Sequence, residues 1–273
     1  MGLIRKKKSS AGKRKVSKKT NFSVLVGNAH HIGMRECQQD SFCISDLSNE
    51  ELCKSRGILA VIADGMGGMA DGFEAATIVS RSMLQYFNEI ESSGKPEHDL
   101  LNMVIAANNN VNRFMSSREQ GGSTVVAVII LNDNLYWISV GDSRIYLARN
   151  GTLSQLNREH IYAADLDEMA AKGEVSWEYA AADPNRAALT SYIGAKELDK
   201  IDRNLRPLQL VYGDRVLLVS DGIFNALTDN EIQTTMSQPP QENAVQLMKM
   251  TLDKQNPNQD NLTAVVLEYR GAS

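Results

Sequence analysis

The chain has 273 residues, of which 42% are hydrophobic and 23% are charged, a composition typical of globular proteins. Its 19 glycines and 6 prolines are too few for a collagen or a Pro-rich linker protein. No apolar run approaches the roughly 18 residues of a membrane-spanning helix. No apolar stretch follows the basic start of the chain, as it would in a secretory signal. We therefore expect a water-soluble protein.

Charge is unevenly distributed along the chain. Residues 1–20 contain nine Lys and Arg residues and no Asp or Glu, a charge of +9, whereas the other residues contain 20 basic and 33 acidic side chains, a net charge of −13. Because such a basic segment cannot bury a core, we predict a disordered tail over residues 1–20 and a folded domain over residues 21–273. The tail suits an anionic membrane surface, nucleic acid or another polyanion, or the acidic domain itself, and it is also consistent with a leader that only aids solubility.

The cysteines and histidines indicate neither disulfides nor zinc. Cys37, Cys43 and Cys53 form no Cys-x-x-Cys pair and are odd in number, which argues against a disulfide framework and predicts a reducing compartment. The four histidines lack the spacing of a zinc site. Without a secretory signal, the expected location is the cytoplasm.

Alternating and apolar runs separated by turn residues predict a series of strands. The connectors Asn132–Asn134 and Arg149–Gly151 are short enough to indicate antiparallel pairing. The predicted strands are Phe22–Asn28, Ser41–Ser45, Ile58–Ala63, Thr124–Leu131, Leu135–Val140, Arg144–Ala148, Val216–Ser220 and Leu262–Tyr269.

Helices are predicted at fewer places. Apolar residues spaced by three and four mark Phe73–Ile90 and Asp99–Met115, and two more helices are expected at Asp229–Met236 and Gln241–Asp253. The Ala-rich, charged stretch Glu159–Pro184 predicts a helical insertion outside the main sheets, which is either a lid over a site or a surface excursion. Antiparallel strands with separate helical blocks indicate an α+β fold with helices on the sheet faces.

Aspartates recur where predicted strands begin or end. Asp64 and Asp221 each follow an apolar run and precede a glycine, which allows the backbone to approach a ligand closely. Asp40, Asp142 and Asp260 have similar positions at other strands. A single Asp-Gly is usually a turn, but several strand-end carboxylates in an acidic domain suit hard divalent cations such as Mg²⁺ or Mn²⁺.

Seven segments in chain order extend this pattern: GMRECQQD (33–40), ADGMGGMADGFEA (63–75), GGSTVVAVII (121–130), LYWISVGDSRIYLARNGTLSQLNREH (135–160), LTSYIGA (189–195), GDRVLLVSDGIFNAL (213–227) and QDNLTAVV (259–266). Together they resemble the metal-dependent protein serine/threonine phosphatases of the phosphatase 2C type, the PPM family. Residues 173–194 look like the bacterial branch, where this segment includes a mobile flap beside the active site.

The resemblance implies a four-layer sandwich of two antiparallel sheets flanked by helices, with a flap insertion near residues 160–188. It also implies two divalent cations, Mn²⁺ or Mg²⁺, at one end of the sandwich. By motif, the cations would be bound by Asp64, Asp221, Asp260 and the carbonyl of Gly65, and Asp142 would help to form a weaker third position.

The same resemblance implies the catalytic roles. Arg35 would clamp the phosphate, Asp40 would hold metal-bound water, and a metal-bridging water would hydrolyse phosphoserine or phosphothreonine in proteins. The protein would then oppose a Ser/Thr kinase and act as a monomer. The alternative is a catalytically weak phosphatase-fold module that binds phosphoproteins or a regulator.

Four positions depart from the family pattern. Met66 stands where many members have a His that is a candidate general acid, and Asn225 replaces an Asp that helps some members to bind the third metal. Gln38 and Gln39 replace the usual Asn-Glu before Asp40, so the orientation of water there is expected to differ.

Overall fold

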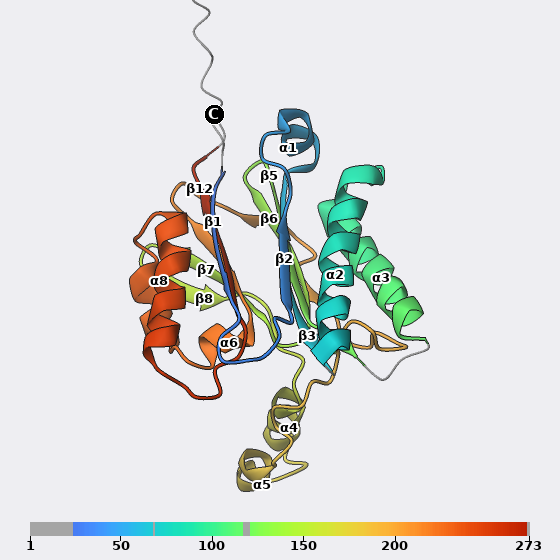
Figure 1. The fold of residues 1–273 in the computed structure, drawn as a ribbon, viewed down its shortest axis with the longest axis vertical. Coiled ribbons are helices and arrows are strands. Elements are labelled where there is room, and N and C mark those ends of the chain that lie inside the picture. The colour runs from blue at the N-terminus through green and yellow to red at the C-terminus, as the bar shows by residue number, and fades with distance from the viewer. Residues whose placement is uncertain (1–23, 68, 117–120, 272–273) are drawn as a thin grey trace, which may run out of the picture.

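The computed structural model describes residues 24–67, 69–116 and 121–271, so the predicted tail lies outside the described residues. Two antiparallel sheets form the centre of the molecule (Figure 1). The first contains, in order, β1 (Val24–His31), β12 (Leu262–Tyr269), β11 (Arg215–Val219), β7 (Arg144–Arg149) and β8 (Thr152–Gln155). The second contains β10 (Leu208–Gln209), β6 (Asn134–Val140), β5 (Val125–Leu131), β3 (Ile58–Met66) and β2 (Asp40–Ile44), with β4 (Gly122–Ser123) paired to β3 and β9 (Asp202–Arg203) paired to β6.

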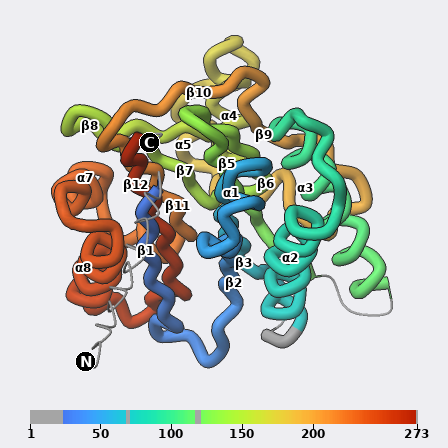
Figure 2. Tube along the Cα trace, turned by 90° about the horizontal axis from the view of Figure 1, so that it is seen from above, coloured from blue at the N-terminus to red at the C-terminus, as the bar shows by residue number. Residues whose placement is uncertain are grey.

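Helices cover the outer faces of both sheets (Figures 1 and 2). On the second sheet lie α2 (Met69–Glu89) and α3 (Pro96–Met115), and on the first lie α6 (Asp221–Phe224), α7 (Asp229–Thr235) and α8 (Pro240–Asp253). The short helix α1 (Glu50–Arg56) follows β2, and α4 (Tyr162–Ala171) and α5 (Trp177–Ala182) project from one end of the sandwich. The predicted α+β sandwich is therefore confirmed.

Three hydrophobic layers hold these four layers of secondary structure together. Along β3, Ile58, Ala60 and Ile62 face the first sheet, and the alternating residues between them face α2 and α3. Because both faces are covered, the strand is apolar from Ile58 to Ala63, as far as Asp64. On α2, Met83 and Phe87 are completely buried, and each such side chain contributes about 1.5–3 kcal/mol through burial.

The insertion is closed at its base by backbone pairing. The amide of Tyr162 donates to the carbonyl of Ala188, and the amide of Thr190 donates to the carbonyl of His160. Within it, Leu166, Ala170 and Ala180 form a small separate core. The insertion therefore has the position and helical content that the sequence predicted, and Figure 1 shows it outside both sheets.

Most predicted elements agree with the structure to within a few residues, and the differences have local causes. The helix α1 was not predicted, because none of its residues is buried and its sequence shows no apolar periodicity. The strand β8 was not predicted either, because its residues are mostly exposed. The helix α2 ends at Glu89, so Ile90, predicted as its last apolar position, is exposed.

The two ends of β12 define the two ends of the sandwich. Val24 pairs with Tyr269 at the end of β12, whereas Asp260 lies just before its first residue, Leu262. Eight residues of strand span about 26 Å, so Val24, which follows the predicted tail, lies far from Asp260. Among the described residues, no helix has the length and apolar composition needed to cross a membrane.

Candidate active site

A cleft of about 270 Å³ lies at the end of the sandwich from which α4 and α5 project. The antiparallel order brings the ends of β3, β6 and β11 to the same place as the start of β12. The residues that line the cleft are Arg35, Gln39, Asp64, Gly65, Met66, Gly67, Thr124, Asp142, Leu189, Asp221, Asp260 and Asn261. Six of the seven predicted site residues are in this set, and the seventh, Asp40, is the direct partner of Asp64 in the β2–β3 pair.

Asn261 fixes the loop that carries Arg35. Its amide nitrogen donates to the carbonyls of Ile32 (2.8 Å) and Cys37 (3.1 Å), and its amide oxygen accepts from the backbone of Gln39 (2.7 Å). These bonds tie the segment between β1 and β2 to the start of β12. The guanidinium of Arg35 is thereby placed beside Asp260, with Nη2 2.7 Å from Oδ2.

Asp40 is almost completely buried, with 2% of its surface exposed. Its Oδ2 accepts hydrogen bonds from the hydroxyls of Thr263 (2.5 Å) and Ser220 (2.7 Å). Its Oδ1 is buried without a hydrogen-bond partner among the described residues. Burial raises the pKa of Asp40 to about 6, although the two hydroxyl donors oppose this effect.

The carboxylates of the cleft repel one another. Burial, followed by the charge of Asp40 and then of the other aspartates that line the cleft with Asp64, raises the pKa of Asp64 well above its usual range. Burial and the charges of Asp142 and Asp260 raise the pKa of Asp221 to about 7, and Arg35 acts in the opposite direction. Burial also raises the pKa of Asp142. Among the described residues that line the cleft, Arg35 is the only cationic side chain, so the negative charge is poorly compensated.

The residues present fit divalent cations in their donor chemistry. Carboxylate oxygens are ligands that Mg²⁺ and Mn²⁺ prefer, and a cation would relieve the repulsion that raises these pKa values. The unpartnered Oδ1 of Asp40 offers a further acceptor. Among the described residues, no three Asp, Glu, His or Cys side chains already converge as a complete ligand set. The fit therefore rests on donor type and charge.

The backbone at Gly65 is packed too closely for a side chain. A Cβ there would lie 2.1 Å from the carbonyl oxygen of Gly72 in α2 and 2.8 Å from that of Gln39. Met66, the next residue, lines the cleft in place of the family's His. Asn225 donates from its amide nitrogen to Oδ2 of Asp221 at 3.1 Å, so it contacts a predicted metal ligand directly.

Three polar residues that hold the site together were not predicted from the sequence: Asn261, Ser220 and Thr263. Each lies in a segment already recognised by motif, next to or near a predicted aspartate. Ser220 and Thr263 are completely buried at strand ends of otherwise apolar runs. Buried polar groups normally have hydrogen-bond partners. A polar residue within an apolar run could therefore have indicated a hydrogen bond to a neighbouring site residue.

The model of the family described as protein phosphatase 2C matches residues 27–266. The chain is 29% identical over 229 residues to serine/threonine protein phosphatase PstP of Mycobacterium tuberculosis, covering 81% of this chain and 42% of PstP. It is 26% identical over 216 residues to serine/threonine phosphatase stp of Listeria welshimeri, covering 77% of this chain and 84% of that protein. The chain belongs to the protein phosphatase 2C family.

A solved structure supports the same assignment. The catalytic domain of serine/threonine protein phosphatase PstP, in complex with two manganese ions, is 25% identical and has a TM-score of 0.71. The comparison covers 90% of this chain and 98% of that one. The chain spans only 42% of the length of PstP, the first of the curated relatives.

We expect Asp221→Asn to stabilise the metal-free protein and to abolish its stabilisation by Mn²⁺. The amide keeps the shape of the side chain but removes one of the mutually repelling charges, which should raise the melting temperature by about 2–5 °C. Saturating Mn²⁺, at about 100 times its dissociation constant, should stabilise the wild type by about 2.7 kcal/mol. Thermal unfolding with and without Mn²⁺ measures both effects.

The matched control is Asp199→Asn, which changes an exposed aspartate that does not line the cleft. This variant should keep the full response to Mn²⁺. An Asp221→Asn protein that Mn²⁺ stabilises as much as the wild type would remove Asp221 from the ligand set.

Proposed function

We propose that this chain is a metal-dependent phosphatase that hydrolyses phosphoserine and phosphothreonine in proteins. The observation that carries the proposal is the cleft in which Asp64, Asp221 and Asp260 lie with a single cationic side chain, Arg35. Membership of the protein phosphatase 2C family and the names of the relatives support the same reaction. A Ser/Thr protein kinase would supply the phosphorylated substrate.

Arg35 would bind the phosphate of the substrate. Its side chain is 54% exposed and carries a planar guanidinium that matches two phosphate oxygens at once. Its ion pair with Asp260, which is 36% exposed, is worth at most about 1 kcal/mol. Arg35 can therefore turn from Asp260 to an arriving phosphate at little cost.

Asp64, Asp221, Asp260 and the carbonyl of Gly65 would hold two divalent cations, Mn²⁺ or Mg²⁺. Asp142 would contribute to a weaker third position, where Asn225 supplies no charge. When bound, the cations would lower the pKa of water so that it attacks phosphorus at neutral pH. Asp40 would orient water through Oδ1, because Oδ2 is already engaged by two hydroxyls.

The proposal is tested by phosphate release from a phosphothreonine peptide. We expect release with Mn²⁺ or Mg²⁺, loss of release with EDTA, and recovery when the cation is restored in excess. A folded protein that binds the peptide but releases no phosphate with either cation would contradict the proposal and support the catalytically weak binding module instead. Comparing the two cations at equal concentration decides which is preferred.

Arg35→Lys should raise KM for the phosphopeptide about tenfold and change kcat less than threefold. Lysine keeps the positive charge but loses the two parallel donors, and the clamp acts in both the ground state and the transition state. Steady-state kinetics on the peptide measure the two constants. Arg113→Lys, on the exposed surface of α3, is the matched control and should change neither. An unchanged KM in Arg35→Lys would exclude the clamp.

We further propose that residues 1–20 bind an anionic membrane surface. They lie outside the described residues, but Val24 lies at the end of β12 opposite Asp260. A membrane that contacts the Val24 end of the sandwich would leave the cleft, at the opposite end, open to substrate. Each basic residue near such a surface contributes roughly 1 kcal/mol.

Deleting residues 1–20 should therefore leave turnover of a small phosphomonoester unchanged and reduce adsorption to vesicles that contain phosphatidylserine. Adsorption of the full chain should weaken with added salt, because physiological buffer screens charges over about 8–10 Å. Neutral vesicles and a tail of equal length with glutamine in place of its nine basic residues are the controls. Faster turnover after deletion would instead indicate a tail that covers the cleft.

A further inference from the structure

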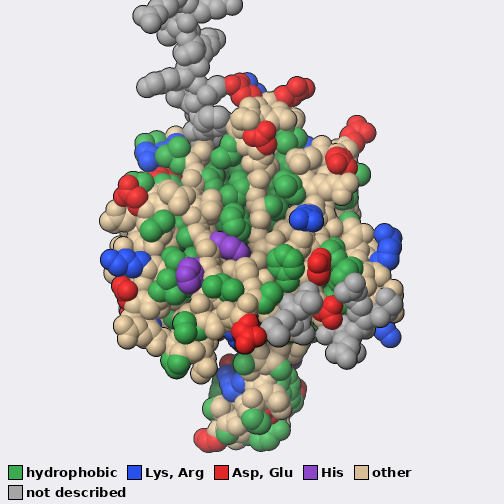
Figure 3. Space-filling model, in the orientation of Figure 1, with side chains coloured by type: hydrophobic (Ala, Val, Ile, Leu, Met, Phe, Trp, Pro, Cys, Tyr) green, Lys and Arg blue, Asp and Glu red, His purple; other side chains and the backbone are tan. Residues whose placement is uncertain are grey.

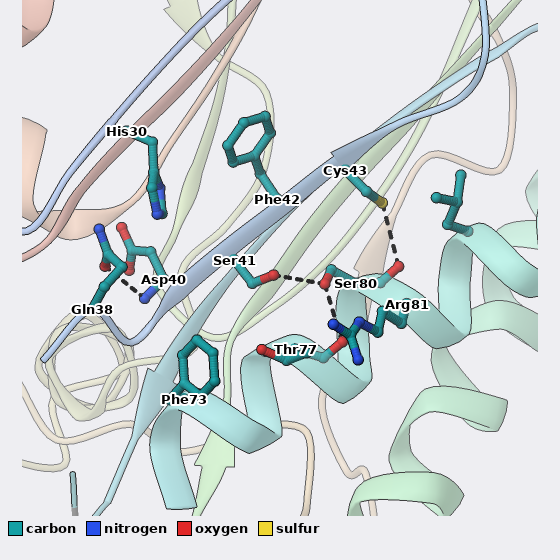
Figure 4. A pocket seen from close by; sticks show the side chains of 11 residues that line it. His30, Gln38, Asp40, Ser41, Phe42, Cys43, Phe73, Thr77, Ser80 and Arg81 are labelled. Atoms are coloured by element: carbon teal, nitrogen blue, oxygen red, sulfur yellow. Dashed lines mark hydrogen bonds between the residues drawn. The ribbon is translucent and has the colours of Figure 1, made fainter. Parts of the chain in front are cut away.

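A second cavity, of about 360 Å³, lies beside the buried carboxylate of Asp40, between β1, β2 and α2. Figure 4 shows His30 above Gln38 and Asp40, with Phe42 on the neighbouring side. The strands β1 and β2 are the edges of their two sheets, and Figures 1 and 2 show them side by side. Figure 3 shows histidine side chains at the surface in this region.

A chain of hydrogen bonds leads from this surface to Asp40. Nδ1 of His30 lies 3.0 Å from the hydroxyl oxygen of Thr263. The Thr263 hydroxyl lies 2.5 Å from Oδ2 of Asp40. The Ser220 hydroxyl donates to the same oxygen, and the amide of Thr263 donates to Ser220 at 3.0 Å. Asp40, Ser220 and Thr263 therefore form a closed, buried ring, and His30 is its contact with solvent.

The direction of each bond follows from the number of protons available. Thr263 has one hydroxyl proton, and it donates this proton in its hydrogen bond to the carboxylate of Asp40. The Thr263 oxygen can then only accept from His30, so Nδ1 of His30 must carry a proton. Burial and the neighbouring His31 lower the pKa of His30, which favours the neutral ring. The neutral ring then has its proton on Nδ1 and leaves Nε2 as an acceptor.

This arrangement fixes the orientation of the Asp40 carboxylate, whose strand partner Asp64 lines the cleft. Two donors hold Oδ2, and Oδ1 has no partner among the described residues. If the Thr263 hydroxyl turned away, Oδ2 would lose a donor and the carboxylate could rotate. The bond from His30 prevents this, because a hydroxyl that already accepts on one side keeps its proton directed to the other.

We propose that His30 is a positioning residue for the reaction at Asp40, acting by holding the Thr263 hydroxyl in its donating orientation. The proposal rests on the proposed phosphatase function. It assigns a role to a residue that lies outside the cleft and touches neither cation nor substrate. The His30 side chain would act by hydrogen bonding alone.

His30→Leu tests the proposal, because leucine has no N–H to donate to Thr263. Its side chain also fills the space in which a water molecule could donate instead. We expect kcat on p-nitrophenyl phosphate with Mn²⁺ to fall about fivefold, the change that one lost hydrogen bond produces, with KM unchanged. His30→Asn places an amide N–H where Nδ1 was and should recover most of kcat. Equal losses in the two variants, or a wild-type kcat in His30→Leu, would overturn the proposal.

Thr263→Val provides the double-mutant test. It should lower kcat at least as much as His30→Leu, and adding His30→Leu to it should cause no further loss, because His30 acts through Thr263. Additive losses would overturn the proposal. His98→Leu, which changes an exposed histidine of α3, is the matched control and should keep wild-type kcat.

A spectroscopic measurement separates this proposal from the proposed function. Nitrogen-15 NMR of the metal-free protein at pH 7.5 should show His30 as the Nδ1–H tautomer, and Thr263→Val should remove that preference. An Nε2–H tautomer in the wild type would overturn the assignment, whatever the activity. Failure of phosphate release with the expected tautomer would instead contradict only the function on which the proposal rests.

Discussion

The constraint on which the site depends is the repulsion among carboxylates held at one end of a tightly packed sandwich. Five aspartates from strands and loops up to 220 residues apart lie close enough for the charge of one to raise the pKa of another: Asp40, Asp64, Asp142, Asp221 and Asp260. Left to themselves, such groups would move apart or take up protons. The apolar layers on both faces of each sheet provide the rigidity that keeps them close.

Polar residues at the same end of the sandwich complete this restraint. Asn261 ties the Arg35 loop to β12, and Ser220 and Thr263 join β11 and β12 to Asp40 of the other sheet. These bonds cross between the two sheets where the hydrophobic core ends. They are directed, unlike hydrophobic contacts, so they fix the orientation of a carboxylate as well as its distance. Packing therefore brings the charged groups together, and the buried hydroxyls and amide orient them.

The elements that could be predicted from the sequence are those in which the pattern of apolar residues follows the buried faces. The strands β3, β5 and β12 are apolar on both faces, and α2 has an apolar stripe, so their residues alone indicate what they are. By contrast, α1 is stabilised locally, with Asn49 as its N-cap, and no periodic signal marks it. The candidate site was found through motifs that include its aspartates. Its hydroxyl ring was not found, because it depends on the packing of the two sheets, which brings Thr263 beside Asp40, 223 residues away in the chain, and no local pattern specifies that contact.

The departures from the family pattern lie in groups that donate or accept around the proposed ligands. At position 225, an amide donates to Oδ2 of Asp221 where a carboxylate would have added a sixth negative charge. Asn in place of Asp at this position lowers the repulsion among the carboxylates of the cleft, and its hydrogen bond occupies one lone pair of Asp221. It therefore weakens any third cation position and leaves Asp64 and Asp260 untouched. Likewise, Oε1 of Gln38 accepts from the backbone of Asp40, a bond that holds the start of β2 without adding charge. At position 225 a neutral amide therefore limits the negative charge that the fold must hold together, whereas at position 38 one neutral amide replaces another and keeps a hydrogen bond to the backbone.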